Sequence, residues 1–148
     1  MILGTPELSG VVPEFSWPIE GTVTSRYGRR WSGWHRGIDI LASPGDTIHA
    51  AAAGVVIASG TESQYGNVVK IEHESGYVTV YAHNTDNLVE VGDRVGAGQI
   101  IGTVGQTGRA TRAHLHFEVR HIGRVFDPLH LLPRSPRIAI VEDETADD

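Results

Sequence analysis

Two strand-like runs stand next to each other in the chain, Val68-Val69-Lys70-Ile71-Glu72-His73 and Tyr77-Val78-Thr79-Val80-Tyr81-Ala82-His83. Both are rich in β-branched and aromatic residues, which favour extended backbone. The short break between them, Glu74-Ser75-Gly76, contains a glycine. Extended runs separated by such a break predict an antiparallel β-hairpin.

Outward from the hairpin, the same period of two continues. Val55-Val56-Ile57-Ala58 is bounded by glycines, and Leu115, Phe117 and Val119 alternate with polar residues. Glycine-containing breaks recur about every 8–12 residues, a spacing typical of β-sandwiches and barrels. The stretches Ala50–Ala53 and Pro128–Leu132 are the sole helix candidates, and both are short. The sequence therefore predicts an all-β fold with at most short helices.

A weak internal repeat supports that fold class. Residues 45–50 and 92–97 share the pattern Gly-Asp-x-[Ile/Val]-x-Ala. A tight turn entering a strand explains the repeat, and such loops occur in lipoyl- and biotinyl-type hairpin folds.

Composition excludes several classes of protein. The chain has 148 residues, no cysteine and 40% hydrophobic residues, without an apolar run long enough to span a membrane. Disulfides and a cysteine nucleophile are therefore excluded. The net charge is −6, but five acidic residues lie in the last seven; without them 12 basic residues face 13 acidic ones. The remainder lacks the basic footprint of a nucleic-acid-binding domain.

The sequence divides into three parts. We expect an N-terminal extension over residues 1–16, a domain over 17–133 and an acidic, disordered tail over 134–148. Residues 1–10 contain neither the basic nor the apolar region of a signal peptide.

Eight histidines in a chain of this size direct the search for a site. His35 and Asp39 are four residues apart, which in a straight strand means roughly 13 Å. That distance is too long for one metal ion, although Gly37 between them can supply a bend. A surface histidine and a turn aspartate are the alternative interpretation of this pair.

His114 and His116 share one face of the predicted strand, with Cα atoms roughly 6.6 Å apart. Both rings can converge on one point, although a polar strand face would give the same pattern. Together with His35 and Asp39 they supply two or three histidines and one carboxylate. This is the ligand set of a catalytic zinc ion with an open coordination position.

A zinc hydrolase also needs a proton carrier. The chain has no His-Glu-x-x-His motif, so imidazoles must serve. His83, at the end of its run, and one of the pair His114 and His116 are the candidates. The other four histidines have no partners at ligand spacing: His49, His73, His121 and His130.

These motifs, in this order, resemble the lysostaphin-type (LytM-like) zinc metallopeptidases, which cut peptide cross-links of bacterial peptidoglycan. The resemblance covers about residues 17–132. The matching segments are Trp17-Pro18, Thr24 through Arg30, His35 through Ile40, Tyr65-Gly66-Asn67, Gly76 through His83, Val91 through Val95, Thr107-Gly108-Arg109, His114 through Arg120, and Asp127-Pro128.

The resemblance implies a two-layer antiparallel β-sheet groove with a zinc ion on its floor. It implies His35, Asp39 and His116 as zinc ligands and His83 and His114 as the proton-transfer residues. The implied substrate is a peptide of peptidoglycan and the implied place is the periplasm or the cell envelope outside the cytoplasm. We therefore expect the domain of a longer, exported or anchored precursor, the alternative being a chain that starts at Met1.

Further expectations concern neighbours of the site and partners. Glu118 shares the strand face of the histidines and can fix the tautomer of one of them. Trp31 and Trp34 are candidates for lining the groove. We expect a monomer, with a regulatory protein or a pro-segment as a partner and no nucleic acid.

Two alternative functions stay open. Some relatives of this family have lost ligands and regulate other wall hydrolases, so a non-catalytic module that binds the wall is the first. A non-haem iron enzyme with two histidines and one carboxylate is the second, although the close His-x-Asp spacing of such enzymes is absent.

Overall fold

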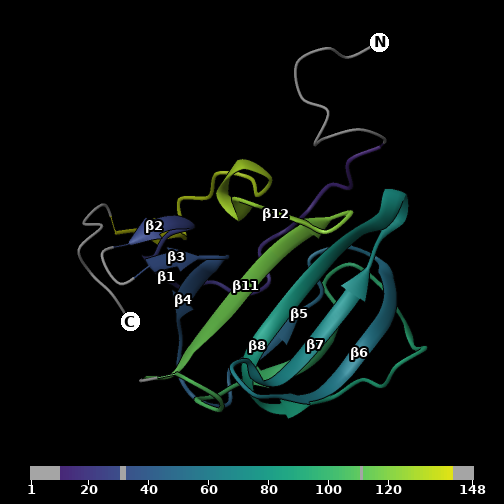
Figure 1. Ribbon diagram of the computed structural model, residues 1–148, viewed down its shortest axis with the longest axis horizontal. Coiled ribbons are helices and arrows are strands. Elements are labelled where there is room, and N and C mark those ends of the chain that lie inside the picture. The colour runs from purple at the N-terminus through teal and green to yellow at the C-terminus, as the bar shows by residue number, and fades with distance from the viewer. Residues whose placement is uncertain (1–10, 31–32, 111, 142–148) are drawn as a thin grey trace.

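The predicted hairpin forms the middle of the sheet in the computed structural model, which describes residues 11–30, 33–110 and 112–141 (Figure 1). Strand β7 (Gly66–Glu72) runs antiparallel to β8 (Tyr77–Asn87), and Val69 lies opposite Tyr81. The connection is a single 3-10 turn, η2 (Glu74–Gly76). Ser75 takes a positive φ of 60° there, a conformation that is uncommon for a residue other than glycine.

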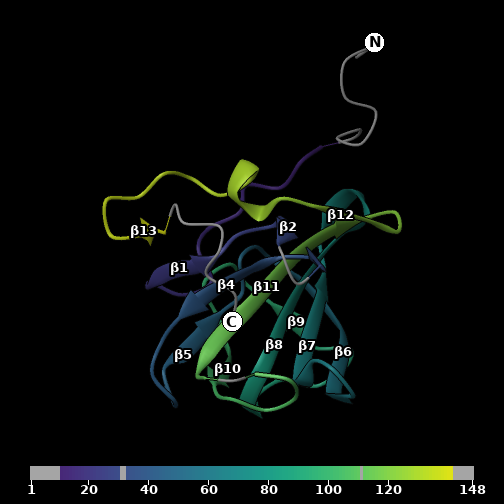
Figure 2. The same ribbon diagram turned by 60° about the vertical axis from the view of Figure 1, so that its left-hand side comes forward.

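The long sheet extends from this hairpin in both directions, and Figure 2 shows β4 and β8 on either side of β11. Its order is β13 (Ala139–Ile140), β1 (Thr22–Ser25), β4 (Ile38–Leu41), β11 (His114–His121), β8, β7, β6 (Gly54–Glu62) and β9 (Arg94–Val95). The β1–β13 pair is parallel, and the other pairs along this order are antiparallel.

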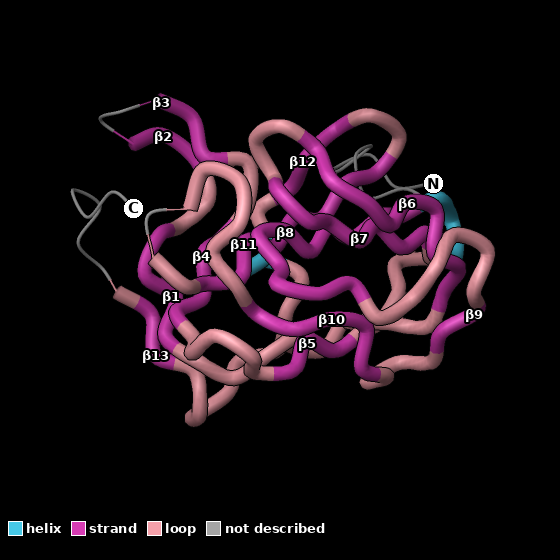
Figure 3. The backbone as a smooth tube through the Cα atoms, turned by 90° about the horizontal axis from the view of Figure 1, so that it is seen from below, coloured by secondary structure: helices cyan, strands magenta, loops and turns pink. Residues whose placement is uncertain are grey.

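The remaining strands attach to this sheet or stand beside it. Strand β10 (Ile100–Val104) pairs with the end of β8 and with β5 (Thr47–His49), while β12 (Arg124–Phe126) pairs with β11. A separate two-stranded ribbon consists of β2 (Gly28–Arg30) and β3 (Gly33–His35). In Figure 3, β5 and β10 lie to one side of β7, β8 and β11, so the chain forms two layers.

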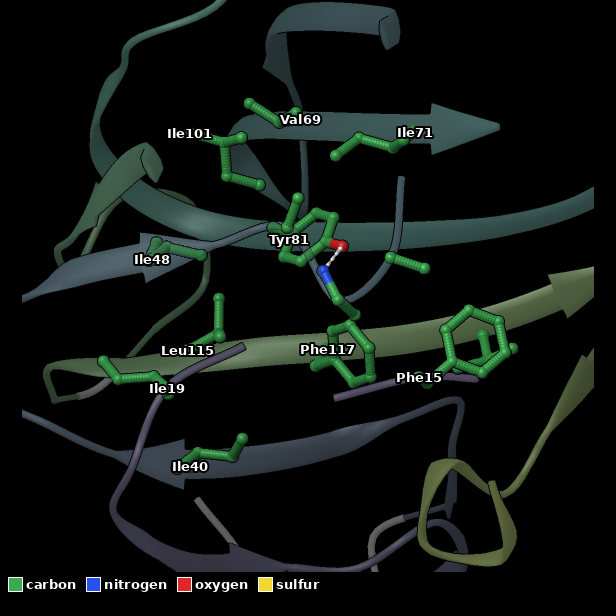
Figure 4. Packing of buried hydrophobic residues seen from close by; sticks show 14 of the residues in the cluster. Phe15, Ile19, Ile40, Ile48, Val69, Ile71, Tyr81, Ile101, Leu115 and Phe117 are labelled. Atoms are coloured by element: carbon green, nitrogen blue, oxygen red, sulfur yellow. Dashed lines mark hydrogen bonds between the residues drawn. The ribbon is translucent and has the colours of Figure 1, made fainter. Parts of the chain in front are cut away.

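The hydrophobic core fills the space between these layers (Figure 4). Tyr81, Leu115 and Phe117 point into it from the long sheet, and Ile48 and Ile101 approach from β5 and β10. The prediction of an all-β, antiparallel fold with short helices is confirmed. The core residues of β11 all lie on one face of this strand. The residues that alternate with them along the chain must therefore lie on the other face.

The two helix predictions had different outcomes. The one for residues 50–53 is wrong, because these residues form a bent connection. Ala50 and Ala51 belong to the core there, and Ala51 N–H donates to the Tyr81 hydroxyl (2.9 Å). The second is a 3-10 helix, η3 (Pro128–His130), whose first turn is capped by the Asp127 carboxylate. Among the described residues, none of the helices is long and apolar enough to cross a membrane.

The predicted domain boundaries lie inside the packed chain. On the N-terminal side, Phe15 belongs to the core and Ser16 N–H donates to Ala51 O (2.8 Å). On the C-terminal side, Ile138 is buried and β13 pairs with β1, so the order extends past residue 134. Residues 1–10 and the acidic residues 142–148 lie outside the described part of the chain.

Candidate functional site

Strand β11 separates the core from a polar groove. Leu115 and Phe117 are fully buried on the core side, whereas His114, His116 and Glu118 lie on the opposite side, as the alternation predicted. These three polar residues are at most 7% exposed, so they face other protein groups at the floor of a groove. Polar groups buried to this extent must be paired to be tolerated.

A bend at Gly37 brings His35 and Asp39 together. Strand β3 ends at His35 and β4 begins at Ile38, so the backbone between them is not straight. His35 Nε2 consequently lies 3.2 Å from Asp39 Oδ1. A Cβ atom on Gly37 would come within 2.2 Å of Phe117 O, so the bend packs tightly on β11 and excludes any side chain there.

Asp39 lies beside His116 because their strands are neighbours. The two residues are directly opposite each other in the β4–β11 ladder. His116 Nδ1 donates to Asp39 Oδ1 at 2.9 Å, and His114 Nε2 lies 3.5 Å from the same oxygen.

His83 reaches the groove through a β-bulge. Tyr77 and Tyr81 point into the core, so strict alternation along β8 would send His83 there as well. The β7–β8 register shifts at this point, and His83 takes a positive φ of 69°. A non-glycine residue in that region is strained by about 1–2 kcal/mol. The strained backbone redirects the ring to the groove, 4.9 Å from the ring of His114.

His35, Asp39 and His116 have the geometry of a metal site. Each offers one ligand atom, and the three atoms lie within 4.8 Å of one another. Zinc–ligand bonds of about 2.1 Å at tetrahedral angles place ligand atoms about 3.4 Å apart. The observed separations of 2.9 and 3.2 Å from Asp39 Oδ1 fit this requirement. Two imidazoles and one carboxylate leave one position of a tetrahedron for water or substrate.

Backbone carbonyls orient three of the four histidines. A carbonyl oxygen only accepts hydrogen bonds, so the ring nitrogen beside it must donate. The Nδ1 atoms of His35, His83 and His114 donate to Arg26 O (3.0 Å), Thr107 O (2.7 Å) and Arg112 O (2.9 Å), respectively. The Nε2 atom of each ring is thereby the one that is available to the groove.

His116 is oriented the other way by a carboxylate. Its Nε2 donates to Glu118 Oε2 at 2.8 Å, and its Nδ1 faces Asp39. Burial alone would lower the pKa of His116, but the two carboxylates raise it to about 9. A metal ion at Nδ1 therefore has to displace a proton.

The pKa values of the two carboxylates and of His83 are all lowered by their surroundings. Burial would raise the pKa of Asp39, yet hydrogen bonds from His116 and His35 hold it well below its usual range. Glu118 behaves alike: His116 and Tyr65 outweigh burial and lower its pKa to about 2. Burial, followed by repulsion from His114, lowers the pKa of His83 to about 4, so His83 is neutral at pH 7.

The groove around these side chains has a volume of about 560 Å³. Trp34 lines it and is 60% exposed, with an edge-to-face contact to Tyr27 at 5.5 Å. Trp31, the other tryptophan predicted to line the groove, lies outside the described residues. Arg36 and Arg109 also line the groove and were given no role by the sequence interpretation.

Tyr65 is a further groove residue that sequence reasoning missed. Its loop packs against the loop of Thr107 so closely that a Cβ atom on Gly66 would lie 2.5 Å from Gly108 N. The sequence carried a signal for this contact, because each of the two segments has a glycine where the backbones touch: Tyr65-Gly66-Asn67 and Thr107-Gly108-Arg109.

The other four histidines have structural surroundings. His73 bonds to Ala53 O and Thr79, and His121 stacks on Tyr77 with ring centroids 4.1 Å apart. His49 bonds to Thr47 and to a backbone carbonyl, and His130 is an exposed neighbour of Asp127. These residues do not line the groove.

Curated relatives cover most of the chain. The lipoprotein NlpD/LppB homolog of Pseudomonas aeruginosa is 40% identical over 88% of this chain and 44% of its own length. The murein hydrolase activator NlpD of Escherichia coli is 40% identical over 83% of this chain and 32% of its own. The chain thus spans less than half the length of these relatives.

Solved structures share the fold. A zinc-containing peptidase from Vibrio cholerae has a TM-score of 0.72 and 34% identity over 77% of this chain and 39% of its own. The catalytic domain of the antimicrobial peptidase lysostaphin from Staphylococcus simulans has a TM-score of 0.65 and 31% identity over 76% of this chain and 90% of its own. The predicted resemblance is confirmed.

The histidines and Asp39 at the floor of the groove, and the strands β3, β4, β8 and β11 that carry them, fall within one sequence match. The model of peptidase family M23 matches residues 33–128, a range that runs from β3 to the start of η3. The chain therefore belongs to peptidase family M23.

Proposed function

We propose that this chain is a zinc-dependent endopeptidase that hydrolyses peptide cross-links or stem peptides of bacterial peptidoglycan. The observation that carries the proposal is the convergence of His35, Asp39 and His116 within 4.8 Å at the floor of a groove. A structural role does not require an open groove over such a cluster. The family supports a peptidase, and the murein and zinc named in the relatives and solved structures support the substrate and the metal.

In this proposal His35 Nε2, Asp39 Oδ1 and His116 Nδ1 would hold the zinc ion. Their site would thereby gain a Lewis acid for the scissile carbonyl and for lowering the pKa of a bound water. Asp39 balances one positive charge, and the carbonyl of Arg26 keeps the Nε2 atom of His35 aimed at the site. Glu118 holds the Nε2 atom of His116, which keeps the Nδ1 atom of that ring aimed at the site.

His83 and His114 carry protons in this scheme. Their Nδ1 protons are committed to Thr107 O and Arg112 O, so each Nε2 has a lone pair free for a proton. Neutral His83 can accept the proton of the attacking water. The imidazole that has taken this proton can then give it to the leaving amine as the peptide bond breaks, and the second ring lies next to it, with centroids 4.9 Å apart.

A regulatory module is the second candidate, because the relative from Escherichia coli carries the name of a murein hydrolase activator. Such a module would bind peptidoglycan or another wall hydrolase through the same groove. The complete cluster of His35, Asp39 and His116 favours catalysis, since a binding role needs no metal ligands.

The place and partners follow from the same proposal. Relatives described as lipoproteins support a position in the bacterial cell envelope. We propose that the chain acts as a monomer on peptidoglycan peptides, under the control of a regulatory protein or a pro-segment.

Digestion of purified peptidoglycan tests the proposal. The zinc-loaded chain should release fragments whose masses show one hydrolysed peptide bond and intact glycan, and Asp39→Ala should release none. If instead the chain cuts nothing but accelerates a separate wall hydrolase, and Asp39→Ala does so equally, the regulatory module is correct.

A further inference from the structure

Glu118, which orients His116, stands at the centre of a hydrogen-bonded network whose other members, Tyr65 and Arg120, have no role in the mechanism above. Its side chain is completely buried and is held at both oxygens. Oε2 accepts from His116 Nε2 (2.8 Å) and from the Tyr65 hydroxyl (2.5 Å). Oε1 accepts from Arg120 Nε (2.8 Å). A buried carboxylate needs this many donors to offset the loss of water.

Tyr65 and Arg120 also hold each other. Arg120 Nη2 donates to the Tyr65 hydroxyl at 2.8 Å, so that hydroxyl has its own proton directed to Glu118. The ring of Tyr65 stacks on the ring of His116 with centroids 5.8 Å apart and an interplanar angle of 27°. Tyr65 therefore constrains His116 twice, through its ring face and through the carboxylate that it shares.

The consequence concerns one nitrogen atom. Glu118 Oε2 can accept from His116 Nε2 only while the carboxylate keeps its rotamer and the imidazole keeps its plane. With Nε2 engaged, Nδ1 is the nitrogen directed to Asp39 and to the metal position. Groups that fix Glu118 thus fix which ring atom of His116 is available to a metal ion.

We propose that Tyr65 and Arg120 are positioning residues of the metal centre, which aim His116 Nδ1 at the metal through Glu118. The inference rests on the proposed ligand set but not on hydrolysis. Arg120 acts through the carboxylate, and Tyr65 acts through the carboxylate and through the stacking of its ring on His116. Tyr65 comes from the β6–β7 connection and Arg120 from β11, so the network ties the hairpin to the strand that bears the ligand.

Zinc affinity of the metal-free chain, measured against a competing chelator, tests the proposal. Tyr65→Phe removes the hydroxyl and keeps the ring, and should weaken zinc binding about 10-fold. Arg120→Gln should weaken it about 10- to 100-fold, as should Glu118→Gln. In the Glu118→Gln background, Tyr65→Phe should add less than about 2-fold, because the shared carboxylate is already altered.

Matched controls separate this effect from general damage. Tyr27→Phe removes a hydroxyl that donates to Val125 O at 3.3 Å and keeps the ring in place. Arg124→Gln removes an exposed charge on the neighbouring strand β12. Both controls should bind zinc as the parent chain does.

Nuclear magnetic resonance supplies a readout that a merely structural role would not move. In the zinc-loaded parent chain, the His116 ring should carry its proton on Nε2, and Tyr65→Phe should broaden or shift that signal while the His35 ring is unchanged. Zinc affinities within about 2-fold of the parent for both Tyr65→Phe and Arg120→Gln would overturn the proposal. A chain that binds zinc as described but hydrolyses no peptidoglycan would leave this inference intact and overturn the peptidase function.

Discussion

The two faces of β11 are buried to nearly the same extent but by opposite means. On one face Leu115 and Phe117 are enclosed by apolar neighbours, and their stabilisation comes from removal of hydrocarbon from water. On the other face His116 and Glu118 are enclosed by charged and polar partners, and each depends on a specific hydrogen bond. The core face accepts apolar side chains that fill the same space. The groove face requires specific donor and acceptor atoms at fixed positions.

This difference predicts that substitutions on the two faces fail in different assays. Core changes should lower the free energy of unfolding and should affect the metal only through unfolding. Groove changes should alter zinc binding or turnover at concentrations of denaturant where the chain is still folded.

The largest effect is expected for His116→Ala. It removes a proposed ligand and leaves only His35 and Asp39, so zinc affinity should fall by more than the roughly 100-fold typical of outer-shell changes, and hydrolysis should fall to background. His114→Ala, two residues away on the same face, should bind zinc nearly as the parent does and lose about 100- to 10,000-fold in turnover. Zinc titration and peptidoglycan digestion measure both variants; loss of zinc in His114→Ala with retention in His116→Ala would reverse the assignment.

Phe117→Ala should have the next largest effect, on the other face. The ring is fully buried between the layers and its loss creates a cavity, so the free energy of unfolding should fall by about 3–5 kcal/mol. Urea unfolding of the metal-free chain measures this change. Folded Phe117→Ala should still bind zinc, and a loss below about 1 kcal/mol would mean that the core face contributes far less than its burial indicates.

The smallest effect concerns the bulge that turns His83 to the groove. At a φ of 69°, glycine is unstrained and alanine is not, so His83→Gly should be about 0.5–1 kcal/mol more stable than His83→Ala. At Val78, on the regular part of the same strand, alanine should instead be more stable than glycine. Urea unfolding of the four variants checks this reversal; the same order at both positions would contradict the strained backbone.

Local patterns predicted much of the fold and part of the site. The composition of β7 and β8 and the glycine between them were enough for the hairpin, and the alternation in β11 placed His114, His116 and Glu118 on one face. These predictions depend on side-chain period and turn chemistry, which act over a few residues.

The rest depends on contacts between distant parts of the chain. His83 departs from the side-chain alternation of its strand because a β-bulge rotates it. The position is not a glycine, so the sequence does not indicate the positive φ. His35 and Asp39 approach each other through a bend in the backbone. The spacing of the two residues in the sequence does not determine the angle of that bend. Tyr65 reaches Glu118 across 53 residues of sequence, so no local pattern could join them. The pairing of β13 with β1 likewise joins residues more than 100 positions apart, so the charge pattern at 142–148 gave no sign of it.

Metal removal and reconstitution of the parent chain test the central claim most directly. The chain stripped of metal by a chelator should release no peptide fragments from purified peptidoglycan, and one equivalent of zinc should restore release in full. Hydrolysis that persists in the stripped chain, or that stays absent with stoichiometric zinc bound, would contradict the assignment of the groove as a zinc peptidase site.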